Sequence, residues 1–150
     1  LKAVMYPGQQ AHDLIRPDYV TDIKTLAGIP DASLDFIVAC HVIEHTNNPI
    51  AAIDSCYRAL KPGGSLVLIV PDMTKTFDSK RALTTIEHLI EDYETPSCER
   101  DLEHYEEFYT KAFEMPSDAK LEDYAAQKQT EGGDLHYHTW TFESFEKLVD

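Results

Sequence analysis

Two short runs of almost wholly apolar residues stand out along the chain. They cover residues 35–40 and 65–70, and polar residues or Pro71 bound each of them. Continuous apolar runs of this length are typical of strands in a parallel sheet whose two faces are both covered. We therefore predict two buried strands here. Two weaker apolar runs, at residues 2–6 and 19–20, predict further short strands.

The residues between the two strong runs follow a helical pattern. Apolar side chains recur at intervals of three and four over residues 50–60, and Pro62-Gly63-Gly64 ends the pattern. Asn47-Asn48 offers N-caps, and Pro49 suits the first helical position. A strand, a helix and a second strand in this order form a right-handed crossover unit. The sequence thus predicts an α/β fold with a Rossmann-like, doubly wound and mostly parallel sheet.

The second half of the chain changes to an acidic, helical pattern. Residues 80–130 carry two apolar stripes at helical spacing. We interpret them as a helical insertion that covers a substrate site, and a plain helical layer on the sheet is the alternative. Residues 136–140 alternate in polarity and predict a further strand, and residues 141–149 predict a closing helix. Because that helix lacks a stop signal and the chain starts at Leu1, we expect a single domain, incomplete at both ends.

Charge and composition limit the classes of partner that we expect. Against 13 Lys and Arg stand 27 Asp and Glu, which gives a formal charge of -14. Such a charge repels a phosphate backbone and an anionic lipid surface, so we expect neither nucleic acid nor a membrane as partner. The three cysteines match neither a disulfide framework nor a paired metal motif, and no signal-peptide pattern is found. We expect a cytoplasmic protein, and nothing indicates its oligomeric state.

Four short motifs follow one another between Asp18 and Asp72. They are the Asp-Ile pair at residues 22–23, SLDFIV at residues 33–38, the Glu-His pair at residues 44–45, and LKPGG at residues 60–64. In this order and spacing they resemble the part of a class I S-adenosylmethionine-dependent methyltransferase domain that follows its cofactor loop. The resemblance implies S-adenosylmethionine as cofactor. It also implies methyl transfer by in-line displacement to an oxygen, or a nitrogen, of a small polar acceptor.

A narrower likeness extends to most of the chain. The stretch VPDMTKTFDSKRALTTIEHLIEDY, at residues 70–93, and HYHTW, at residues 136–140, resemble bacterial methyltransferase-domain proteins found alongside glycosyltransferases of surface-polysaccharide assembly. This second resemblance implies a sugar or a glycan precursor as the small-molecule acceptor.

The resemblance and the chemistry of the cofactor together select candidate binding residues. Adenine offers an amine that needs an acceptor and a flat apolar face, which Asp22 and Ile23 can satisfy together. Asp13 is the candidate for the ribose hydroxyls, and Cys40 and His41 leave a strand where the family holds the sulfonium end of the cofactor. The alternatives are that Asp22 only caps a turn and that Cys40 only fills the core.

His41, Glu44 and His45 form an H-x-x-E-H string that allows three interpretations. The first is an inverted zincin motif of a zinc peptidase. The second is a metal-assisted methyltransferase site that resembles the Glu-x-x-Glu-His string of ubiquinone-biosynthesis and small-RNA 2′-O-methyltransferases, with His136 or His138 as a distant ligand. In the third, His41 faces the cofactor while the Glu-His pair charges the start of a helix. We favour the third and therefore predict no metal ligand.

Three histidines, His41, His136 and His138, are the candidate catalytic residues. The last two alternate on the predicted strand, so they share a face that could offer a general base to an acceptor hydroxyl. A hydroxyl that attacks an activated methyl group needs mainly positioning. Asp78 and Arg81 are candidates to orient a sugar, and a salt bridge on the surface is their alternative role.

The family's glycine-rich cofactor loop has no counterpart in this sequence. Such a loop donates backbone N–H groups to the carboxylate of the cofactor. Loss of two charge-assisted hydrogen bonds, at roughly 1.5–3 kcal/mol each, would weaken binding by about two to four orders of magnitude. A methyltransferase-like binding or scaffold domain is therefore the alternative function, and the zinc peptidase is the third.

Overall fold

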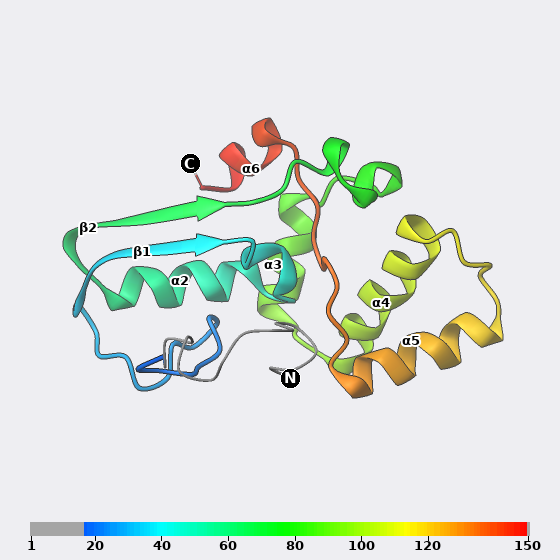
Figure 1. Ribbon diagram of the computed structural model, residues 1–150, viewed down its shortest axis with the longest axis horizontal. Helices are drawn as coiled ribbons and strands as arrows, with labels where there is room; N and C mark the ends of the chain where they lie inside the picture. Colours follow the sequence, from blue (N-terminus) through cyan, green and yellow to red (C-terminus); the bar gives the residue numbers. More distant parts are fainter. Residues whose placement is uncertain (1–16, 150) are drawn as a thin grey trace, which may run out of the picture.

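The computed structural model describes residues 17–149, and within them the predicted crossover unit is confirmed. Strand β1 (Leu34–Cys40), helix α2 (Pro49–Ala59) and strand β2 (Leu60–Ile69) follow one another. The two strands pair in parallel over most of their length, from Phe36 opposite Ser65 to Cys40 opposite Ile69. This mixed α/β unit is the architecture that the apolar runs predicted, with α2 lying along one face of the two strands (Figure 1).

Helix α2 begins where its sequence predicts, but it ends at Ala59, before the predicted stop at Pro62-Gly63-Gly64. The Asn48 side chain accepts a hydrogen bond of 2.9 Å from the backbone N–H of Ala51, and Pro49 occupies the first turn. The helix ends at Ala59 because the next residue is already extended. Within the first half of β2, a Cβ on Gly64 would lie 2.9 Å from the Lys61 carbonyl oxygen, so only glycine fits there.

The prediction that both faces of the strands are covered is wrong for the described residues. Ala39 is buried, but Phe36 is 68% exposed, and Val38, Val67 and Ile69 are exposed as well. The reason is geometric: side chains alternate between faces along a strand, and only one face lies against α2. An apolar run therefore does not by itself show that both faces are buried.

Helices dominate the second half of the chain, as predicted. Four α-helices follow β2: α3 (Ile86–Glu94), α4 (Cys98–Ala112), α5 (Ala119–Glu131) and α6 (Phe142–Val149). Within residues 17–149 there are also three short 3₁₀ segments: η2 (Ile43–His45), η3 (Met73–Lys75) and η4 (Phe77–Lys80). Among the described residues, no helix combines the length and the apolar character that a membrane span requires.

The helices build two separate cores. One core lies at the carboxyl end of the strands and contains Ile43, Ala52, Leu89 and Trp140. The other core lies mainly between α4 and α5 and contains Tyr105, Phe108, Ala125 and Leu135. The segment from residue 132 to residue 141, orange to red in Figure 1, runs between the α4–α5 pair and the strand unit. It contributes a buried residue to each core and so connects them.

Two predicted strands are absent. Residues 136–140 form no strand, because their backbone bonds to several elements in turn. The N–H of Tyr137 donates to Glu44 at 2.7 Å, and Trp140 makes an isolated bridge with Asp72. Residues 19–20 are exposed and irregular. The predicted strand at residues 2–6 lies outside the described residues.

Candidate functional site

A cavity of about 400 Å³ opens at the carboxyl end of β1. Its wall includes Asp22 and Ile23 from the segment before β1, His41 and His45 from the segment after it, and Tyr137 from the connecting segment. Parallel α/β sheets bind their ligands at this edge, where the loops that follow the strands meet. The fold thus brings together three of the predicted cofactor-binding residues, Asp22, Ile23 and His41.

Asp22 closes a turn and also faces the cavity. Its Oδ1 atom accepts a hydrogen bond of 2.8 Å from the backbone N–H of Lys24, so the turn-capping interpretation is confirmed. The Lys24 ammonium lies 3.7 Å from Oδ2 and donates to the Asn47 side chain at 2.7 Å. Ile23 packs against the core of Ile43 and its neighbours. These contacts hold the turn in place, with the Asp22 carboxylate at the wall of the cavity.

His41 leaves β1 in an unusual conformation. Its φ angle is 53°, in the left-handed region that a non-glycine residue seldom adopts, and its backbone N–H still donates to the Ile69 carbonyl at 2.9 Å. The imidazole is 57% exposed, and its Nδ1 lies 3.1 Å from Oε1 of Glu44. Cys40 is exposed, so its alternative role as core filler is wrong. Asp13 lies outside the described residues.

Glu44, His45 and His136 form a group beside this cavity. Each offers one potential metal-ligating atom, and these atoms lie within 4.8 Å of one another. The His45 Nδ1 lies 2.9 Å from the Leu135 carbonyl oxygen, and the His136 Nδ1 lies 2.6 Å from Oδ2 of Asp78. Acceptors on Nδ1 leave Nε2 of both rings available. Because His41 lies outside the group, the two histidines of the H-x-x-E-H string do not converge as an inverted zincin requires.

The Glu44 side chain is fully buried at this group. Its Oε2 atom has no hydrogen-bond partner among the described residues, and its Oε1 atom contacts only the exposed His41 ring. A buried carboxylate oxygen without a partner is costly, so it marks a position where a cation or a donor group would be stabilised.

Asp78 and Arg81 form a buried ion pair, so their predicted alternative as a surface salt bridge is wrong. Their side chains are 2% and 3% exposed, with Nη1 and Oδ1 2.9 Å apart. Arg81 also donates to the His136 carbonyl at 2.7 Å and to Glu107 at 2.8 Å. Burial raises the pKa of Asp78, but hydrogen bonds from His136 and Arg81 outweigh it and hold that pKa below its ordinary value. The pair thus holds the connecting segment in place.

His138 lies apart from His136, so the prediction that the two share one face is wrong. In the absence of a strand, the segment directs His136 toward Asp78 and His45, whereas His138 meets His88 and His104. The histidines at 88 and 104 were missed by the sequence analysis. The available signal was the i, i+4 spacing of His88 and Asp92, which places both on one helical face.

The parallel strand–helix–strand unit and the cavity at its carboxyl edge are features of α/β domains, a class of proteins that bind ligands at the ends of their strands. Residues 6–68 match the family model described as "Methyltransferase domain". Over these residues, fewer than half of the chain, the sequence is therefore similar to the domains of S-adenosylmethionine-dependent methyltransferases. No solved structure gives a significant match.

The similar curated proteins carry methyltransferase names. The "Ubiquinone biosynthesis O-methyltransferase" of Xanthomonas oryzae pv. oryzae is 29% identical over 99 residues, 65% of this chain and 39% of the relative. The mitochondrial protein of that name from Rattus norvegicus is 46% identical over 41 residues, 27% of this chain and 12% of the relative. A "Probable S-adenosylmethionine-dependent methyltransferase" of Mycolicibacterium smegmatis is 39% identical over 44 residues, 29% of this chain and 17% of the relative. The chain thus spans well under half the length of each of these relatives.

Proposed function

We propose that this domain transfers the methyl group of S-adenosylmethionine to an oxygen of a small polar acceptor. The observation that carries the proposal is the meeting of Asp22, Ile23 and His41 around one cavity at the carboxyl end of β1. These residues come from both sides of the strand, and the names of the similar O-methyltransferases support the same reaction.

Each cavity residue has a task that its chemistry suits. The Asp22 carboxylate accepts a hydrogen bond from the adenine amine, and Ile23 gives the ring an apolar contact. Two further residues do not belong to the described lining of the cavity: Asp13 is assigned to the ribose hydroxyls, and Cys40, next to the cavity-lining His41, is assigned with it to the sulfonium end. The cofactor supplies an already activated methyl group, so these residues act mainly by positioning it for in-line attack.

We further propose that the acceptor is a sugar or a glycan precursor. This part rests on the likeness of residues 70–93 and 136–140 to methyltransferase-domain proteins of surface-polysaccharide assembly. Helices α3 to α5 then serve as the cover over the acceptor. His136, held by Asp78 and adjacent to the cavity-lining His45, is placed to accept the proton of the attacking hydroxyl.

The Glu44–His45–His136 group supports a second candidate, metal-assisted methylation. Two imidazoles and a buried carboxylate fit a divalent cation, which would act there as a Lewis acid on the acceptor oxygen. The string resembles the Glu-x-x-Glu-His of metal-assisted methyltransferases, although His41 stands in its first position. The observation that favours this candidate is the unpartnered Oε2 of Glu44.

Calorimetric titration with S-adenosylmethionine and S-adenosylhomocysteine tests the cofactor site. We expect binding by this chain, and a loss of about 10- to 150-fold in Asp22→Ala, which removes one charge-assisted hydrogen bond. Asp35→Ala is the matched control, because Asp35 is an exposed aspartate at the opposite end of β1. No binding by the folded chain would refute the proposal for this chain and favour the scaffold function. Equal binding by Asp22→Ala would refute the role of Asp22.

Transfer of a labelled methyl group then tests the acceptor. Nucleotide sugars and a catechol are offered in parallel, with and without added magnesium or zinc. Label in the sugar supports the saccharide proposal, and label only in the catechol refutes it. A rate that depends on the metal and falls in Glu44→Gln supports the metal-assisted candidate, and a rate indifferent to both refutes it.

A further inference from the structure

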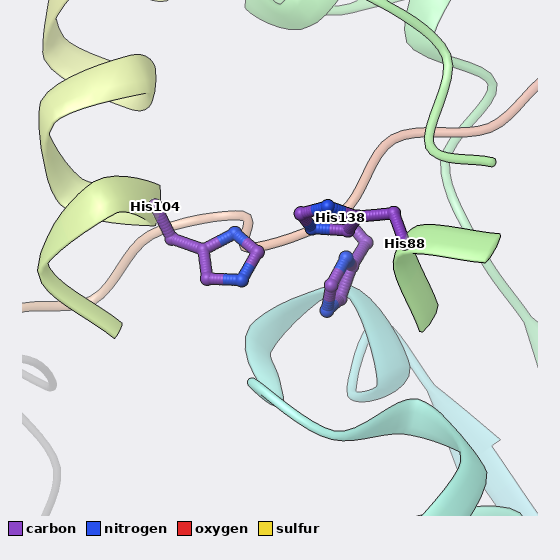
Figure 2. A group of neighbouring side chains, drawn as sticks. All are labelled: His88, His104 and His138. Atoms are coloured by element: carbon purple, nitrogen blue, oxygen red, sulfur yellow. The ribbon is translucent and has the colours of Figure 1, made fainter. Parts of the chain in front are cut away.

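Three histidines from distant parts of the sequence meet where α3, α4 and the connecting segment approach one another (Figure 2). His88 comes from α3, His104 from α4 and His138 from the segment after α5. Each offers one potential metal-ligating nitrogen, and these atoms lie within 4.8 Å of one another. The ring centres are 5.0 to 5.7 Å apart, with the planes steeply inclined to one another.

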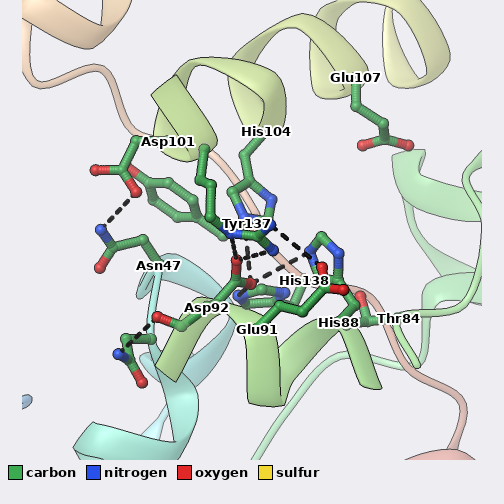
Figure 3. Close-up of polar contacts among 12 residues, drawn as sticks. Asn47, Thr84, His88, Glu91, Asp92, Asp101, His104, Glu107, Tyr137 and His138 are labelled. Carbon is green, nitrogen blue, oxygen red and sulfur yellow. Dashed lines mark hydrogen bonds and ion pairs between the residues drawn. The ribbon is translucent and has the colours of Figure 1, made fainter. Parts of the chain in front are cut away.

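A carboxylate lies at the point where these rings converge (Figure 3). Oδ2 of Asp92 is 3.2 Å from Nε2 of His88, 3.4 Å from Nε2 of His104 and 3.7 Å from Nε2 of His138. The other oxygen of Asp92, Oδ1, accepts two hydrogen bonds from Arg100 at 2.6 and 2.9 Å. Arg100 therefore orients the carboxylate so that Oδ2 faces the three imidazoles.

The polar atoms at this point lack partners. Both ring nitrogens of His138 are without a hydrogen-bond partner among the described residues. The same holds for Oδ2 of Asp92. The His138 side chain is fully buried, and that of Asp92 is 3% exposed. Buried polar groups are nearly always paired, and leaving several unpaired in one place is costly. A cation at their centre would satisfy them together.

The four side chains are of the types that bind zinc in proteins. Three imidazoles and one carboxylate are ligands that zinc accepts.

We propose that His88, His104, His138 and Asp92 bind a zinc ion. A tetrahedral ion with bonds of about 2.0–2.1 Å separates its ligand atoms by about 3.3–3.4 Å. The distances of 3.2 to 3.7 Å from Oδ2 of Asp92 to the three nitrogens bracket that value. Four protein ligands complete the shell, as in structural zinc sites. Magnesium and calcium prefer oxygen ligands, so a nitrogen-rich set disfavours them.

The ion would join three segments that local sequence does not hold together. The ion would link α3 and α4 to the segment of residues 132–141. Its ligand in that segment, His138, directly follows Tyr137, which lines the cavity. Zinc would therefore stabilise the α3–α4 arrangement and hold that segment against the neighbouring cavity. The site is separate from the Glu44–His45–His136 group and does not depend on the proposed methyl transfer.

The test is zinc binding to the metal-free chain at one equivalent, followed by X-ray absorption at the zinc edge. We expect a shell of four nitrogen or oxygen ligands that includes three imidazoles. Zinc at the Glu44–His45–His136 group would show only two imidazoles. This measurement needs no variant, and a folded chain that binds no zinc, or binds it through two imidazoles, overturns the proposal.

Two matched histidine variants locate the ion independently. His88→Gln removes a ligand whose side chain is 41% exposed, so the metal-free fold should persist, as circular dichroism can verify. We expect its zinc affinity to fall by about 100-fold or more, because even the loss of an outer-shell partner costs 10- to 100-fold. His45→Gln should bind zinc and gain thermal stability from it as the unmodified chain does. Affinity lost in His45→Gln and kept in His88→Gln overturns the assignment.

Discussion

The buried Asp78–Arg81 pair allows a sharp stability prediction. Asp78→Ala removes the carboxylate that accepts from both Arg81 and His136, and it leaves the almost fully buried Arg81 guanidinium with only the partly exposed Glu107 as counter-charge. Breaking one partner of a buried ion pair costs about 3–5 kcal/mol. We therefore expect the free energy of unfolding to fall by that amount, with a lower urea midpoint and an unchanged slope.

A neighbouring pair provides the control. Lys80, in η4, pairs with Glu114, just beyond the end of α4, and both of these side chains are well exposed. Glu114→Gln should leave the urea midpoint unchanged, because water already solvates both charges. A loss below about 1 kcal/mol in Asp78→Ala, or equal losses in the two variants, would refute the reasoning that burial makes the Asp78 pair costly to break.

The same pair has a defined pH dependence. The pKa of Asp78 lies below its ordinary value of 3.8 in the folded chain, so the unfolded chain takes up the proton first as the pH falls. The stability that this shift contributes is fully present above about pH 3.8 and is lost below it, as the pH passes the folded pKa. The difference in stability between the unmodified chain and Asp78→Asn should therefore shrink as the pH falls below about 3.8. A difference independent of pH would contradict this.

Three further substitutions test the local structure, each by urea unfolding followed by circular dichroism. Asn48→Ala should cost about 1 kcal/mol, because it removes the α2 cap, and Asn48→Ser should restore most of it. Trp140→Ala should cost about 3–5 kcal/mol, because the indole is fully buried in the first core, and Trp140→Phe should cost less. Gly132→Ala should cost about 1–2 kcal/mol, because φ is 66° at the end of α5, and Gly132→Asn should cost less. If Asn48→Ser, Trp140→Phe or Gly132→Asn lowered the free energy of unfolding as much as the alanine variant at the same position, the reason given for that position would be wrong.

Site residues that lie close together in the sequence could be predicted from the sequence. Asp22, Ile23 and His41 lie close to β1 in the sequence, so a strand between two loops brings them to one edge. The Glu44–His45 pair follows directly on the same loop. Its partner His136 is about ninety residues away, and the sequence analysis could propose it only as a distant ligand or as a general base on a predicted strand.

The His88–His104–His138 group could not have been predicted in this way. Its members come from two helices and an extended segment, and each local pattern is compatible with an ordinary surface or core histidine. What brings them together is the packing of α3, α4 and the connecting segment around Asp92. That packing is a tertiary property, which no spacing in the sequence encodes.

By itself, the sequence determined the elements whose signals are local. The crossover unit, the start of α2 at Asn48 and the later helices follow from periodicity, caps and turn residues, which act over a few neighbours. Tertiary structure alone decided whether an alternating segment such as residues 136–140 finds a strand to pair with, and which strand face is covered. It also decided which histidines meet. These outcomes depend on contacts between residues far apart in the chain, and local patterns carry no information about such contacts.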